Sequence, residues 1–109
     1  MPTIDPEAMR VHAGDAAQLL KALGNEKRLM LLCLLAEGER SVGELNARLD
    51  LSQSALSQHL ALLRQDGLVT TRREAQSIYY SLASGPAQAV IATLHGIYCG
   101  GDAPLCEGS

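Results

Sequence analysis

The sequence contains no tryptophan and no phenylalanine, and tyrosine occurs only three times among its 109 residues. A core must therefore be built from aliphatic side chains, and the abundant leucine and alanine favour helices. No apolar run reaches the ~18 residues that a membrane-spanning helix needs. The opening stretch, MPTIDPEAMR, also lacks the apolar segment of a signal peptide. We expect a mainly helical, cytoplasmic protein of one domain.

Cysteine is scarce as well, with Cys33, Cys99 and Cys106 the only three and no Cys-x-x-Cys spacing. This excludes a standard structural zinc finger. Cytoplasmic cysteines more often bind metals or undergo redox chemistry than form structural disulfides. The sequence also lacks a glycine-rich phosphate loop, a paired carboxylate site and a recognisable Ser/His/Asp set. We therefore expect neither an enzyme nor a bound cofactor.

Positive charge is not in excess, since the formal net charge is −3. Indiscriminate binding to polyanions is therefore not expected, but the distribution of charge matters more than its sum. The segment 53–80 holds three arginines and two acidic residues, whereas the rest of the chain is more acidic. This segment is the side of the protein that we expect to face phosphate.

Apolar residues recur at helical spacing in five segments, and the caps of several helices can be read directly. Asn25 precedes the leucine-rich second segment, which is apolar on nearly all sides, so Cys33 is expected inside the domain. Ser41 and Glu44 form a capping box. The predicted helices are 11–23, 25–36, 41–49, 52–66 and a last one from Pro86 to Cys99.

Between the fourth and fifth helices the apolar period changes to two, which predicts strands over 68–74 and 77–82 around a turn at Ala75 and Gln76. A short helix, a tight turn and a longer helix form a helix-turn-helix, and the hairpin after it is a wing. The expected fold is mainly α with a small β-hairpin, a winged helix-turn-helix of order α-α-α-α-β-β-α. We assign residues 1–100 to this domain and 101–109 to a flexible tail.

The fourth helix begins with short hydrogen-bonding side chains, which a recognition helix needs where it enters the major groove. Glutamine can pair with adenine, and a helix N-terminus can bind a phosphate. Each of these residues taken alone is equally compatible with an ordinary solvated surface. The candidate DNA-contacting residues are Ser52, Gln53, Ser54, Ser57, Gln58 and His59 in the helix and Arg72, Arg73 and Gln76 in the wing.

The first and last helices carry more apolar residues than one small domain can bury, so they are the expected dimer surface. A single winged helix contacts few base pairs, and specificity usually requires two copies one helical turn apart. We therefore expect a two-fold homodimer that binds palindromic operator DNA.

These features resemble the ArsR/SmtB family of bacterial winged-helix repressors. The matching stretches are LLKALGNEKRLMLL, SVGELNARLDLSQSALSQHLALLRQDGLV and TRREAQSIYYSL, which lie within residues 16–98. The resemblance implies a dimer, DNA contacts from the fourth helix and the wing, and repression released by an inducer.

The metal-sensing branches of that family carry Cys-x-Cys in the third helix or an Asp/His set in the last. Here the third helix reads SVGEL and the last offers His95 alone, so no metal site is expected. The cysteines in LLCLL and IYC resemble the BigR/SqrR/HlyU subgroup, which responds to persulfides and oxidants. The resemblance implies that Cys33 and Cys99 form a disulfide or polysulfide switch. Cys99 lies near a helix end and four residues from His95, so we expect it to react first.

Three alternatives remain open at this point. Cys33 can be a small core residue, because free cysteine is often buried. Cys99, Cys106 and Cys33 can bind arsenite or antimonite, since soft metalloids suit thiolates. The winged helix can also be a protein-interaction module without DNA binding, which would require an apolar face in place of the polar turn at 53–58. His95 is either a charge partner of Cys99 or a surface residue.

Overall fold

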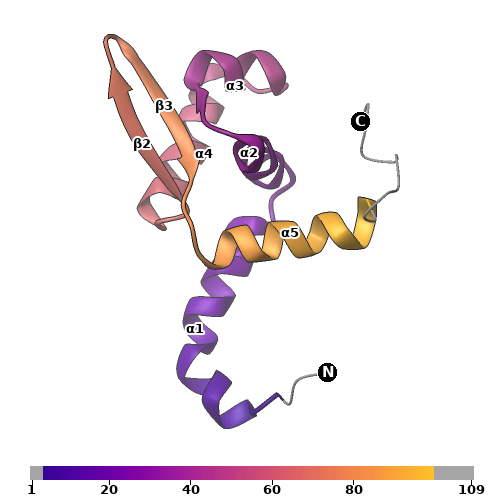
Figure 1. The fold of residues 1–109 in the computed structure, drawn as a ribbon. Coiled ribbons are helices and arrows are strands. Elements are labelled where there is room, and N and C mark those ends of the chain that lie inside the picture. Colours follow the sequence, from indigo (N-terminus) through magenta and orange to yellow (C-terminus); the bar gives the residue numbers. More distant parts are fainter. Residues whose placement is uncertain (1–3, 100–109) are drawn as a thin grey trace.

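The computed structural model describes residues 4–99 as five helices and three strands. Their order confirms the predicted winged helix-turn-helix and adds one short strand before the third helix (Figure 1). The predicted tail, 101–109, lies outside the described residues. The elements are α1 (Pro6–Leu23), α2 (Glu26–Glu37), β1 (Arg40–Ser41), α3 (Val42–Arg48), α4 (Gln53–Gln65), β2 (Val69–Glu74), β3 (Ser77–Leu82) and α5 (Pro86–Cys99).

Helix α1 begins at Pro6, earlier than the predicted start at Val11. The side chain of Asp5 accepts a hydrogen bond from the backbone amide of Glu7 at 3.0 Å, and Pro6 occupies the first turn, where it suits helical geometry. The caps of the later helices agree with the prediction. Asn25, for example, accepts hydrogen bonds from the first amides of α2 at 3.0 and 3.1 Å.

Leucines from three helices form the centre of the core, as the apolar periodicity predicts. Six of them have at most 2% of their surface exposed: Leu31, Leu32, Leu45, Leu56, Leu60 and Leu63. Ala87 and Ile91 add the first half of α5 to this core. Cys33 only packs against it and remains partly exposed, because it lies on a different face of α2 from Leu31, Leu32 and Leu35.

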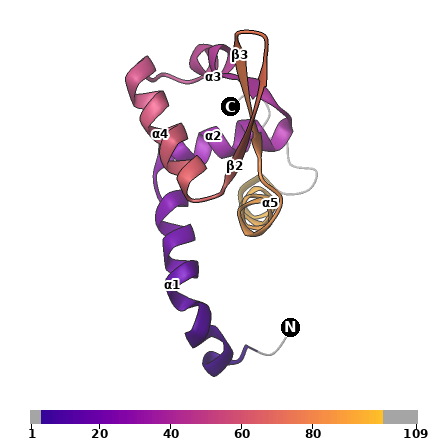
Figure 2. The ribbon, with the colours of Figure 1, turned by 90° about the vertical axis from the view of Figure 1, so that its left-hand side faces the viewer.

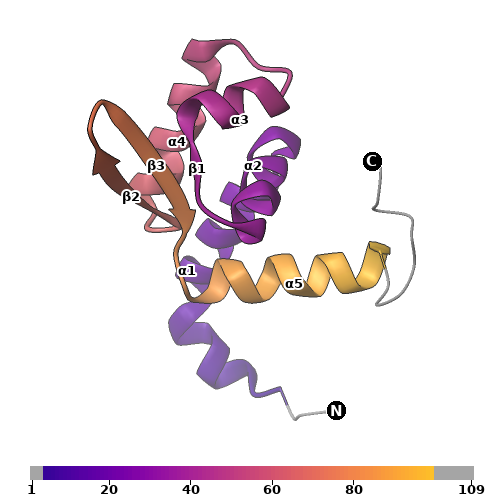
Figure 3. The same ribbon diagram turned by 45° about the horizontal axis from the view of Figure 1, so that its top comes forward.

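The three strands form an antiparallel sheet of order β1-β3-β2. Tyr80 lies between Arg40 on one side and Thr71 on the other. The hairpin stands beside α3 and α4, and α5 runs along the base of the domain (Figure 3). The wing and the helix-turn-helix therefore share one side of the molecule.

Helices α1 and α5 both extend beyond the body of the domain, α1 downward (Figures 1 and 2) and α5 sideways (Figure 1). These helices and the residue before α1 carry large apolar side chains that are 51–80% exposed: Ile4, Met9, Val11, Leu20, Ile97 and Tyr98. No helix within residues 4–99 is both long and apolar enough to cross a membrane.

Candidate nucleic-acid interface

The helix-turn-helix is fixed at its start by the predicted capping box. The Ser41 hydroxyl accepts from the amide of Glu44 at 3.2 Å, and the Glu44 carboxylate accepts from the amide of Ser41 at 2.9 Å. The hydrogen bond from the Ser41 amide is the main cause that holds the pKa of the Glu44 carboxyl below its ordinary value, so the carboxylate is ionised at neutral pH. Because Ser41 also belongs to β1, the box joins α3 to the sheet.

Helix α4 separates an apolar face from a polar one. Ser52 caps the helix by accepting from the amide of Ala55 at 3.1 Å. Leu56, Leu60 and Leu63 on the inner face are at most 2% exposed. The predicted contact residues on the outer face, Gln53, Ser54, Ser57 and Gln58, are all exposed. The helix is therefore anchored from behind while its first turns are free to meet a ligand.

His59 lies at the border of the polar face and is only partly exposed. Burial lowers the pKa of its imidazole, and the positive charge of Arg28 lowers it further. Arg28 is itself held by the carbonyl oxygens of Ala22 and Lys21 at 2.9 and 3.2 Å. His59 is therefore neutral at neutral pH.

The wing presents its two arginines differently. Arg73 and Gln76 are exposed near the tip, where Ala75 turns the chain with a φ of 56°. Arg72 is also exposed, but its guanidinium is bound to Glu39 and Glu74 and lies 4.7 Å from the centre of the Tyr79 ring. Glu39 was not among the predicted residues, because it is 33 positions from Arg72 in the sequence.

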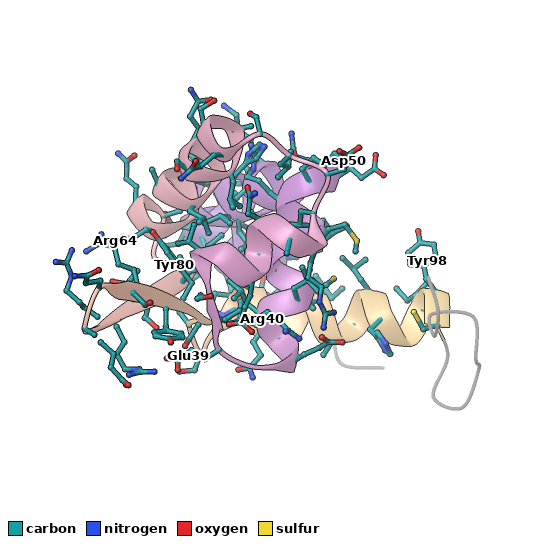
Figure 4. All side chains as sticks on the ribbon, turned by 90° about the horizontal axis from the view of Figure 1, so that it is seen from above. Glu39, Arg40, Asp50, Arg64, Tyr80 and Tyr98 are labelled. Atoms are coloured by element: carbon teal, nitrogen blue, oxygen red, sulfur yellow. The ribbon has the colours of Figure 1, made fainter. Side chains whose placement is uncertain are left out.

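An open groove of about 590 Å³ lies between α4 and β3, with Ser57, Arg64, Gln65, Ile78 and Tyr80 among the residues that line it. Arg64 and Tyr80 lie together on the side of the hairpin, and Tyr98 lies at the opposite end of the molecule (Figure 4). The structure thus adds Arg64 to the surface shared by the helix and the wing. Its sequence signal was a basic residue on the polar face of α4.

The two candidate sensor cysteines lie on helices that contact each other, since α2 packs against α5. Cys33 is a free thiol, so the predicted Cys33–Cys99 bond is not formed in this structure. Burial raises the pKa of Cys33, and the negative charge of Glu37 raises it further. Cys99, at the end of α5, is disulfide-bonded and only 4% exposed.

His95 is exposed on α5. Within residues 4–99, no three His, Cys, Asp or Glu side chains are grouped so that they could hold a metal ion. Cys106, the third cysteine of the metalloid alternative, lies outside the described residues.

A helix-turn-helix followed by an antiparallel hairpin defines the winged helix-turn-helix class. The family model described as "Bacterial regulatory protein, arsR family" matches residues 25–71. The chain is 56% identical to the transcriptional activator HlyU of Vibrio cholerae over 93 residues, which cover 85% of this chain and 86% of the relative. The chain therefore belongs to the ArsR family of bacterial transcription regulators, which are not enzymes.

Two solved structures support the same assignment. The transcriptional repressor BigR of Xylella fastidiosa has a TM-score of 0.82 and 43% identity, over 88% of this chain and 98% of that one. A homodimeric winged helix-turn-helix DNA-binding domain of Mycobacterium bovis has a TM-score of 0.71 and 32% identity, over 87% and 86%. Relatives of this chain thus include both an activator and a repressor.

Proposed function

We propose that the chain is a cytoplasmic, dimeric repressor that binds palindromic operator DNA and is released by a reactive sulfur species or an oxidant. The observation that carries DNA binding is the first part of α4, where four exposed polar side chains stand on a helix whose opposite face is fully buried. Such a helix can enter the major groove without disturbing the core.

The operator contacts are assigned by position. Gln53, Ser54, Ser57 and Gln58 address base edges, while Ser52, His59, Arg73 and Gln76 address the phosphate backbone. In the dimer, α1 and α5 of two copies cover each other's exposed apolar side chains. Two recognition helices about 34 Å apart would then read successive turns of the major groove.

The switch requires both thiols in the reduced state. A persulfide transfers its outer sulfur to the Cys99 thiolate and leaves as a thiol. The Cys33 thiolate then attacks the Cys99 sulfur, releasing hydrosulfide and forming a Cys33–Cys99 disulfide. With a peroxide, Cys99 becomes a sulfenic acid and Cys33 displaces water. The contact between α2 and α5 supports this pairing, and the bond would shift α5, and with it the dimer, away from the DNA-binding geometry.

The test of DNA binding starts from a random library of duplex DNA. The wild-type protein should enrich a palindromic sequence, and replacing Ser57 and Gln58 by alanine should weaken binding to it while leaving the fold intact by circular dichroism. If no sequence is enriched, the proposed DNA-binding function is wrong.

The switch is tested on the fully reduced protein with a small organic persulfide. Wild type and Cys106→Ser should lose operator affinity by roughly 5- to 150-fold, which corresponds to a coupling of ~1–3 kcal/mol. Cys33→Ser and Cys99→Ser should keep full affinity. An unchanged affinity in all four proteins after treatment would refute the switch.

In the metalloid alternative Cys99, Cys106 and Cys33 bind arsenite, so Cys106 is needed for the response to arsenite, whereas the persulfide switch does not need it. Cys106→Ser should then lose its response to arsenite while its response to persulfide persists. An arsenite titration of the same four proteins therefore separates the two inducers.

A further inference from the structure

Arg72 is the most heavily engaged charged side chain among the described residues. Its Nε and Nη2 donate to the two carboxylate oxygens of Glu39 at 3.0 and 2.7 Å, and its Nη1 donates to Glu74 at 2.7 Å. The guanidinium also stacks over the ring of Tyr79. Three of its five N–H donors are therefore used inside the protein.

The charge of this cluster does not suit a phosphate contact. One guanidinium stands between two carboxylates, so the group as a whole is negative. The hydrogen bonds from Arg72 hold the pKa of Glu39 below its ordinary value, so Glu39 stays ionised at neutral pH. A phosphate that approached Arg72 would meet both carboxylates. Arg73, which follows it, has no ion pair to a described residue.

The position of Glu39 gives the pair a mechanical role. Glu39 directly precedes β1, Arg72 lies on β2, and β3 runs between these two strands. The Glu39–Arg72 pair therefore spans the whole width of the sheet. Glu39 also accepts from the Ser81 hydroxyl of the middle strand at 3.4 Å. Because β1 has only two residues, its backbone pairing with β3 is short, and the Glu39–Arg72 pair adds a direct side-chain link between β2 and the segment before β1.

The segment that carries Glu39, between α2 and β1, is itself fixed to α2. The next residue, Arg40, donates from Nε to the carbonyl oxygen of Leu34 at 3.2 Å and from Nη2 to Glu37 at 2.7 Å. A continuous set of contacts thus runs from the last turn of α2 through Arg40 and Glu39 to Arg72 on the wing. Glu39 and Arg40 lie together beside the sheet (Figure 4).

We propose that Arg72 is a positioning residue, which Glu39 anchors so that the wing holds Arg73 against the DNA backbone. This inference rests on the proposed DNA binding and replaces the direct DNA contact expected of Arg72 with an indirect role. It assigns Glu39, an acidic residue, a favourable role in binding a polyanion.

The test compares two substitutions of equal charge, measured on the duplex that the wild-type protein selects. Glu39→Gln and Glu74→Gln each remove one negative charge beside Arg72, but only Glu39→Gln breaks the link across the sheet. We expect Glu39→Gln to bind about three- to fivefold more weakly than Glu74→Gln, the range set by surface ion pairs with good geometry. If Glu39 merely competes with DNA for Arg72, Glu39→Gln binds as tightly as Glu74→Gln or more tightly, which would overturn the proposal.

A second comparison separates positioning from contact. The double variant Glu39→Gln/Arg72→Gln keeps the wild-type net charge, so we expect it to bind as weakly as Glu39→Gln with an unchanged salt dependence. Arg73→Gln should instead lower the slope of log affinity against log salt by about 1, the signature of a lost phosphate contact. A lowered slope in the double variant would overturn the proposal. If wild type selects no duplex, the DNA-binding function itself has failed.

Discussion

Glu37 lies one helical turn after Cys33 on α2, and its carboxylate adds to the effect of burial, which is the main cause of the raised pKa of the Cys33 thiol. Replacing Glu37 with glutamine removes the like charge that opposes the thiolate. We expect the pKa of Cys33 to fall and alkylation at pH 7 to become about two- to threefold faster, because the thiolate is the reacting form.

This is measured with iodoacetamide in a Cys99→Ser/Cys106→Ser background, where Cys33 is the only thiol. Glu26→Gln, in the first turn of the same helix, is the control and should leave the rate unchanged. An equal rate in both variants would show that Glu37 does not act on Cys33.

The polar turn of α4 should determine sequence preference and not stability. Gln58→Ala should weaken binding to the selected operator by about 1–3 kcal/mol, the range for a lost base contact, and change binding to random DNA little. Gln88→Ala, an exposed glutamine on α5, is the control. Fluorescence anisotropy with both duplexes measures the effect, and an equal loss on both would assign Gln58 to the backbone instead.

Ala75 is the only residue other than glycine with a positive φ in the described part of the chain. Glycine adopts this conformation without a steric cost, so Ala75→Gly should raise the free energy of unfolding by about 0.5–1 kcal/mol. Ala61→Gly, on the exposed side of α4, should lower it by about 1 kcal/mol. Urea denaturation of the two variants measures both changes in the free energy of unfolding. A loss of stability in Ala75→Gly would contradict the prediction.

His59 should make stability depend on pH. Its folded-state pKa is below the ordinary value, so the unfolded chain takes up a proton first as the pH falls. Stability is therefore complete above the unfolded pKa of about 6.5 and declines as the pH falls from there toward the folded pKa. His59→Gln should flatten the curve of unfolding free energy between pH 8 and 5, while His12→Gln, an exposed control, should follow wild type.

Much of the fold could be predicted from local sequence patterns. Leucine spacing located α2 and α4, Asn25, Ser41 and Ser52 located helix starts, and the change of period at 68–82 located the wing. Strand β1 was missed because two residues carry no periodicity, and they become a strand only by pairing with Tyr79 and Tyr80. The start of α1 was placed late because its first turns face solvent and lack an apolar stripe.

The functional surface was predictable where it depends on neighbours in sequence. The exposed turn from Gln53 to Gln58 is an example, since its polarity and its helical phase can both be read directly. The environment of Arg72 could not be predicted, because Glu39 is distant in sequence. The two residues meet only in the folded sheet, where β3 lies between β1 and β2. The exposure of Cys33 and of Cys99 could not be read from the sequence either, since it depends on how helices pack.

Strand β2 is an outer strand of the sheet, so within residues 4–99 one side of its backbone has no neighbouring strand. An open strand of this kind can be extended by another molecule, which is a common beginning of aggregation. Three charged residues in succession, Arg72, Arg73 and Glu74, occupy this strand and make such an addition costly. Charge on the wing therefore also opposes edge-to-edge association between copies of the protein. Apolar residues at these positions would remove that protection and lower solubility.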